Sequence, residues 1–137
     1  MAEKTRSQKL QRLVAVQRHL EQIAEYDLAE TTRQRSEVSQ EMDSVIHALG
    51  SMDPVHHAFS QGYADRFNRL GIKDKQLTGM QELHQMRVQQ ERAKGDRLED
   101  GMREAREAER READDDAIYD IIDQKFGTPA SSKLQKP

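Results

Sequence analysis

Two clusters of side chains have the right types for metal chemistry, but neither has the right spacing. His56 and His57 could bind a transition metal, yet adjacent residues on a helix point about 100° apart. The carboxylates of residues 114–116 could suggest Mg²⁺ or Ca²⁺. Three consecutive carboxylates fan around a helix axis, however, whereas a calcium loop alternates its ligands around a turn glycine. We therefore expect no metal site, and we assign these residues to solvated or packing positions.

Other constellations point no more strongly to catalysis. The chain has no Cys, no glycine-rich phosphate loop, and no Ser nucleophile beside a plausible base. We expect a protein that is not an enzyme and that has no cofactor. The basic residues near the start of the chain, here called the basic start, could touch nucleic acid or anionic lipid. Between Asp96 and Asp123, however, there are twelve acidic and only five basic residues, and these acidic side chains could pair with the basic start. We expect no nucleic-acid partner. The basic start consists of Lys4, Arg6, Lys9, Arg12 and Arg18.

The composition of the chain limits the fold classes that it can adopt. Charged residues make up 34% of the 137 residues, apolar ones also 34%, and aromatic ones only 4%, so a large single core cannot be built. The net charge is only −3, and the polar residues are good helix formers, which favours long solvated helices over disorder. The longest apolar run, residues 13–16, is far too short for a membrane span, so we expect no stable membrane insertion. We expect a cytoplasmic protein.

The predicted fold class is all-α, a long antiparallel two-helix coiled-coil hairpin with a short helical connector. The first helix is predicted over residues 6–49, after a Thr5-x-x-Gln8 capping box. Gly50 is expected in the left-handed conformation that ends helices. The apolar stripe fades around Thr31 and Arg35. In its first half it comprises Leu10, Leu13, Val16, Leu20, Ile23, Ala24 and Leu28, at spacings of mostly three and four residues.

A connector helix is predicted over residues 54–70, capped by Asp53 and stopped by Gly71. Its apolar face is expected to pack on the start of the next helix and to form a small three-helix head. That face consists of Val55, Phe59, Tyr63, Phe67 and Leu70.

The second long helix is predicted over residues 74–126, because this stretch contains no proline and is rich in strong helix formers. Gly127 and Pro129 are expected to end this helix, and residues 128–137 are predicted to be a disordered tail. The hairpin over residues 1–127 is then one domain. Gly79, Gly95 and Gly101 are expected either at tolerated surface positions or where another helix approaches closely.

If the two long helices are aligned at their open ends, Ile118 and Ile122 meet the first helix while Ile121 points elsewhere. The open base is therefore predicted to bind a partner, because a two-helix seam buries only a narrow stripe. Closure within the chain or self-association of that end remains the alternative. The partner-binding candidates are Leu10, Leu13, Leu20, Ile118, Ile121, Ile122 and Phe126.

The layout resembles a known family. A long helix begins almost at once (residues 9–13), aromatic residues follow from Phe59 to Phe67, and a longer Gln/Arg/Glu-rich helix and a short polar tail come last. This order is similar to that of the FliJ family of flagellar export proteins and of the YscO-type stalk proteins of type III secretion.

The resemblance implies a non-enzymatic stalk or adaptor, similar to the gamma stalk of rotary ATPases, that couples a hexameric export ATPase to the export gate. Its implied role is in protein transport and flagellum biogenesis, in the cytoplasm and peripheral to the inner membrane through the export apparatus. The alternative is a generic coiled-coil scaffold or chaperone-like adaptor unrelated to export.

Overall fold

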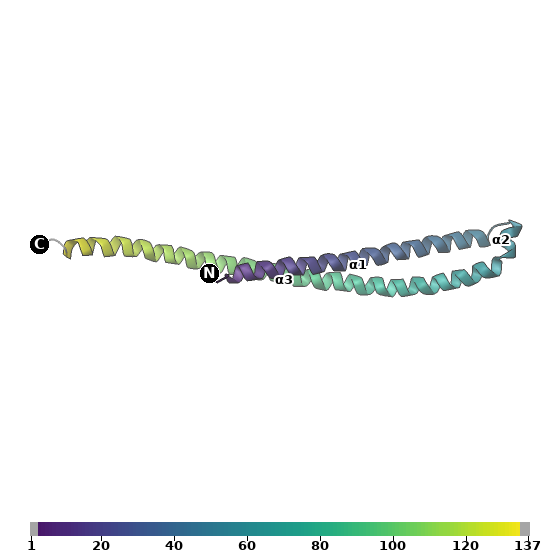
Figure 1. Cartoon of the computed structure of the whole chain (residues 1–137), viewed down its shortest axis with the longest axis horizontal. Coiled ribbons are helices and arrows are strands. Elements are labelled where there is room, and N and C mark those ends of the chain that lie inside the picture. Colours follow the sequence, from purple (N-terminus) through teal and green to yellow (C-terminus); the bar gives the residue numbers. More distant parts are fainter. Residues whose placement is uncertain (1–2, 135–137) are drawn as a thin grey trace. The chain divides into compact units, whose positions relative to one another are not determined.

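Three helices make up the computed structural model, which describes residues 3–134 and the side chains of residues 3–127. Helix α1 is Arg6–Leu49, α2 is Pro54–Ala58, and α3 is Ser60–Leu134 (Figure 1). The two long helices pack against each other, and no strand occurs in the part of the chain just defined. The predicted all-α helical hairpin is therefore confirmed.

The predicted helix starts of α1 and α2 are also confirmed. The Thr5 amide donates to Gln8 Oε1 at 3.1 Å, and the Gln8 amide donates to Thr5 Oγ1 at 3.3 Å, which together form the expected capping box. At α2, Asp53 Oδ1 accepts from the Val55 amide at 3.0 Å, and Pro54 occupies the first helical position. Residues within one turn of each other thus cap both helix starts.

The predicted connector helix over residues 54–70 is wrong. Helix α2 has only five residues, and α3 begins at Ser60 and continues through Gly71 instead of starting near residue 74. A helical glycine costs only about 1 kcal/mol relative to alanine, which the packing of Phe67 and Leu70 on α1 can offset. No three-helix head forms from this face, because the Val55 and Phe59 side chains are 62% and 61% exposed.

Residues 16–95 form one compact unit, an antiparallel pair of helices closed by α2. Arg66 Nη2 lies 3.6 Å from Glu41 Oε2, and Arg92 Nη2 lies 2.8 Å from Glu25 Oε1. Later residues of α3 thus contact earlier residues of α1, as in any antiparallel pair. Near α2 the packing is apolar, and we call this the closed-end cluster. Met42, Tyr63 and Phe67 pack against its four buried members, Val38, Val45, Leu70 and Leu77.

The closed-end cluster sets the heptad register of α1. Steps of seven residues back from Val45 reach Val38, Thr31, Ala24 and Gln17, and all of these side chains are buried. Keeping this repeat brings polar residues into the seam. It also leaves a large part of the predicted apolar stripe outside the seam, which corrects that prediction. The side chains left exposed are Leu13 (52%), Val16 (59%), Leu20 (40%) and Ile23 (40%).

Residues up to Ala15 and residues from Asp96 onward form the other compact unit. Its helices are again antiparallel, because Ser7 of α1 contacts Glu109 of α3 while Leu10 lies at Gly101. α3 then continues well past the start of α1 (Figure 1). The predicted alignment of the two open ends is therefore wrong, because Glu109 contacts the first turn of α1 and α3 continues to Leu134 beyond this contact.

Helix α1 ends at Leu49 as predicted, but Gly50 does not have the expected left-handed conformation, and the predicted end of the second long helix is wrong. The Gly50 amide donates to the Ile46 carbonyl at 3.0 Å as in a continuing helix, and no glycine among residues 3–134 has a positive φ. At the other end α3 runs past Gly127 and Pro129 to Leu134, so residues 128–134 are not the predicted disordered tail. Proline lacks a single N–H donor, and this helix continues past it. The rest of the predicted tail, residues 135–137, lies outside the described residues.

Candidate partner-binding surface

Large exposed apolar side chains lie on α3 after Glu109, in the unit that comprises residues up to Ala15 and residues from Asp96 onward. Every side chain of residues 113–127 is exposed, and we call this stretch the unpaired segment. It begins four residues after Glu109, the partner of Ser7 in the first turn of α1. Five large apolar side chains in it are exposed: Ile118 (54%), Tyr119 (66%), Ile121 (55%), Ile122 (42%) and Phe126 (74%).

These five side chains lie on one side of the helix. At 100° per residue they cover an arc of about 160°, with Ile121 at one edge and Tyr119 at the other. Asp116, Asp120 and Asp123 fall on the opposite side. Asp114, Asp115 and Lys125 fall within the apolar arc, so charged side chains interrupt the apolar face. An exposed helix with large apolar side chains gathered on one side still has the form that docks into a hydrophobic groove of another protein.

Glu109 marks the point at which pairing with α1 begins. Its Oε1 accepts from the Ser7 amide at 3.0 Å and its Oε2 accepts from the Ser7 hydroxyl at 2.5 Å. These bonds satisfy donors in the first turn of α1, where a carboxylate also complements the helix dipole. They hold the pKa of Glu109 below its ordinary value of 4.5. Glu109 thus fixes the register at the base of the hairpin and the start of the unpaired segment.

The structure separates the seven predicted partner-binding residues into three groups. Ile118, Ile121, Ile122 and Phe126 share the unpaired segment. Leu10 instead lies in the seam, half-buried, with its Cδ1 3.9 Å from the position a Cβ on Gly101 would take. Leu13 and Leu20 are exposed on α1. The predicted packing of Ile118 and Ile122 on the first helix is wrong, and the partner-binding role of all seven residues stays a prediction.

The seam in residues 16–95 carries polar contacts between the helices. Gln17 Nε2 donates to the Glu91 carbonyl at 3.1 Å and also to the Glu91 carboxylate, and the bond to the carboxylate lowers the pKa of Glu91. Arg35 Nη1 donates to Gln81 Oε1 at 2.8 Å. Polar residues at seam positions cost stability but specify one register, because a shifted register would leave them buried without partners.

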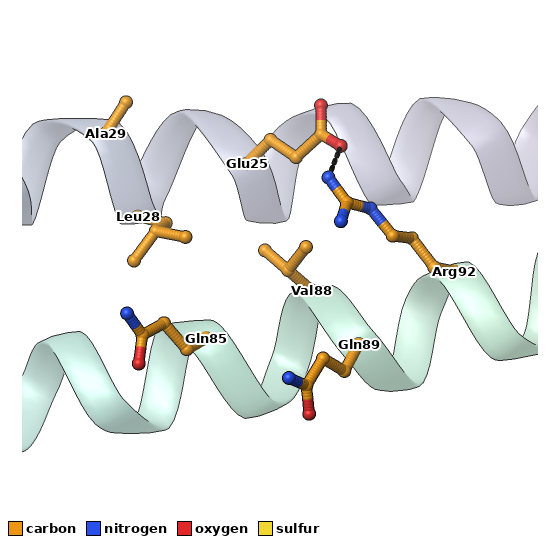
Figure 2. A pocket seen from close by; sticks show the side chains of 7 residues that line it. All are labelled: Glu25, Leu28, Ala29, Gln85, Val88, Gln89 and Arg92. Atoms are coloured by element: carbon orange, nitrogen blue, oxygen red, sulfur yellow. Dashed lines mark hydrogen bonds and ion pairs between the residues drawn. The ribbon is translucent and has the colours of Figure 1, made fainter.

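A shallow groove runs beside this seam, with a floor formed by Leu28 and Val88 (Figure 2). At one end Arg92 Nη2 donates to Glu25 Oε1 at 2.8 Å, so the charged groups of the groove neutralise each other. Gln85 and Gln89 complete the α3 side. The groove is thus lined by one ion pair, two amides and three apolar side chains, and none of these groups is positioned as a nucleophile with a base.

The histidines that raised a metal hypothesis lie at α2. His56 Nδ1 is 2.9 Å from the Tyr63 hydroxyl, and the two ring centroids are 5.8 Å apart. This contact ties the turn to the start of α3. Within residues 3–127 no group of three or more His, Cys, Asp or Glu side chains is arranged to hold a metal ion.

Searches of protein-family models, of curated proteins and of solved structures found no match to this chain. In the described part of the chain, none of the helices has an apolar stretch long enough to cross a membrane.

Sequence analysis did not identify Glu109, which lies next to the unpaired segment. Glu109 was counted only among the acidic residues of α3, although an acidic side chain opposite a Ser in a first helical turn is a recognisable capping pair once the register is known.

Gly95 is buried beneath Arg18, whose Nη1 lies 2.6 Å from the position a Cβ there would take. The alternative expectation for the glycines, close approach of the other helix, holds at Gly95, whereas Gly79 has open space.

Proposed function

We propose that this chain is a non-enzymatic helical adaptor that engages a partner protein through the apolar face of the unpaired segment. The observation that carries the proposal is the exposure of five large apolar side chains on one face, beside the point where α1 ends its cover of α3. Contiguous apolar surface of this kind marks interaction sites on soluble proteins. Polar contacts such as that of Gln17 with Glu91 hold the register of the helix pair in residues 16–95.

For the partner, we propose the hexameric ATPase of a flagellar or type III export apparatus, with the chain acting as its stalk and also contacting the export gate. The support is the order of elements that resembles the FliJ family, together with a hairpin whose second helix is the longer, 75 residues against 44. In this role the protein works in the cytoplasm, at the export apparatus.

The experiment measures binding of the full chain to the purified export ATPase of its own organism, and compares Ile121→Glu with Ile72→Glu. Both isoleucines are exposed, 55% and 60%, but Ile72 lies on α3 far from the unpaired segment. A charge at Ile121 should weaken binding by tenfold or more, on the order of the loss of a central apolar contact. The same change at Ile72 should leave binding unchanged.

Equal binding by both variants would contradict the assignment of the site. If the unchanged chain binds neither the ATPase nor the gate protein, the export role is wrong. In that case the unpaired segment would still require a partner of another kind.

A further inference from the structure

Helix α1 carries a second apolar stripe that α3 does not cover. Leu13, Val16, Leu20 and Ile23 follow one another at spacings of three, four and three residues, and they are 52%, 59%, 40% and 40% exposed. A three-four spacing is the pattern of a helix that packs on another helix along its length. α1 already uses a different three-four series, the one containing Gln17 and Ala24, to pack on α3. It therefore has the pattern for two helical neighbours.

The stripe continues in both directions with charged residues of opposite sign. Toward the start of α1 the same face carries Arg6 and Lys9, and toward the middle it carries Asp27 and Glu30. All of these positions belong to one uninterrupted helix, so the helical repeat alone sets them on one face. Along this face the chemistry changes from basic through apolar to acidic.

This order is complementary to itself when the helix is reversed. A twofold axis beside residue 18 would place Leu13 against Ile23 of a second copy, and Val16 against Leu20. The same axis would place Lys9 against Asp27 of the second copy. It would also place Arg6 against Glu30 of the second copy, so apolar and charged pairs match together in a single arrangement. A parallel pairing in register would instead set each charge against its like.

We propose that the stripe on α1 is an interface with a second copy of this chain, in which two α1 helices pack antiparallel and the two hairpins form a four-helix assembly. The proposal is independent of the export partner, because it uses none of the apolar residues of the unpaired segment. A twofold interface needs one surface that fits itself, and the stripe has that property in both its apolar and its charged positions.

The acidic end of the stripe is accessible although it has contacts within the chain. Asp27 Oδ2 lies 3.9 Å from Arg87 Nη1, and Glu30 pairs with Arg33. The Asp27 and Glu30 side chains remain 37% and 38% exposed. A carboxylate has four lone-pair sites, so each can accept a further cation from a second copy.

The first test measures the mass of the full chain by analytical ultracentrifugation from low to high micromolar concentration. The unchanged chain should shift toward twice its monomer mass. Leu20→Glu should abolish the shift, raising the dimer dissociation constant by about 100-fold or more, because each dimer contains two altered contacts. The matched control Gln22→Glu adds the same charge on a different face of α1, where residue 22 is exposed, and should dimerise normally.

Three results of this first test would overturn the proposal. The unchanged chain could remain a monomer throughout, or Leu20→Glu could dimerise as the control does. Alternatively, Ile121→Glu could dissociate the dimer, which would place the interface on the unpaired segment.

The second test uses charge. A chain with Arg6→Glu and Lys9→Glu has acidic groups at both ends of the stripe, and a chain with Asp27→Lys and Glu30→Lys has basic groups at both ends. Each variant alone should be monomeric, whereas an equimolar mixture should form a dimer of one copy of each. Circular dichroism should show the same helicity for both. Dimers of either variant alone, or a mixture that stays monomeric, would contradict the antiparallel pairing.

Discussion

The closed end and the base of the hairpin use different forces to hold the same two helices together. At the closed end Val38, Val45, Leu70 and Leu77 are buried in one apolar cluster. At the base Ala105 is buried, Ser7 is hydrogen-bonded to Glu109, and Leu10 approaches Gly101 closely. The closed end buries four larger apolar side chains, whereas Ala105 at the base is small, so the closed end carries more of the stability while the base sets register and exposes a surface.

The largest expected effect breaks the closed end. Leu77→Ala should lower the free energy of unfolding by about 2 to 5 kcal/mol, because this side chain is 5% exposed and leaves a cavity. Leu83→Ala is the matched control, since Leu83 is 66% exposed on the same helix and should change stability by about 0.5 kcal/mol or less. Urea denaturation followed by circular dichroism measures both. Equal losses for the two variants would show that the closed-end cluster is not the core.

A smaller effect tests close approach of the helices. Gly79→Ala should raise the free energy of unfolding by about 1 kcal/mol, because its Cβ would meet open space and alanine favours helix. Gly95→Ala should gain less, because its Cβ would lie 2.6 Å from Arg18 Nη1 and the guanidinium must move away. The same denaturation experiment compares them. A gain at Gly95 equal to that at Gly79 would mean that Arg18 does not rest on this glycine.

The base should respond to acid. Hydrogen bonds from Ser7 lower the pKa of Glu109 in the folded chain below 4.5, so its contribution to stability is present above that pH. It should be lost as the pH falls through the lowered pKa. Thermal melts at several pH values below 5 should therefore show a flatter decline for Glu109→Gln than for the unchanged chain. Identical declines would indicate that Glu109 does not hold α1 in solution.

The smallest effect sharpens the distinction between seam and unpaired segment. Ile121→Glu should change the free energy of unfolding by no more than about 0.5 kcal/mol, because the side chain is 55% exposed. Circular dichroism melts provide the measurement. If this variant melts the isolated hairpin, Ile121 belongs to an internal contact and cannot be reserved for a partner.

Local signals in the sequence predicted the helices better than they predicted the pairing. The boundaries of α1, the Thr5–Gln8 capping box and the Asp53 cap follow from residues within one turn of each other, and all three are confirmed. Gly71 misled the prediction because a glycine caps a helix through its own left-handed conformation, and Gly71 has no positive φ. Packing on α1 instead keeps the helix continuous.

Register could not be predicted because α1 contains two overlapping apolar series. Leu13, Val16 and Leu20 are the more apolar choice, yet the closed-end cluster brings the series of Gln17 and Thr31 into the seam. By hydrophobicity alone the series of Leu13 would be buried in the seam, whereas continuity of the seven-residue repeat buries the series of Gln17. The unpaired segment exists because of that register. Ile118, Ile121, Ile122 and Phe126 were predicted as a binding site, but the first helix was wrongly expected to pack against Ile118 and Ile122.

The register at the base is the central claim, and site-directed cross-linking tests it most directly because the chain has no native Cys. One variant carries Leu10→Cys with Gly101→Cys, and the other carries Leu10→Cys with Ile118→Cys. Residues 101 and 118 are about 25 Å apart along a helix, so a short bis-maleimide can bridge only one pair. The structure predicts rapid cross-linking within one chain for the Leu10 and Gly101 pair and none for Leu10 and Ile118. Preferential cross-linking of Leu10 to Ile118 would contradict both the register and the existence of the unpaired segment.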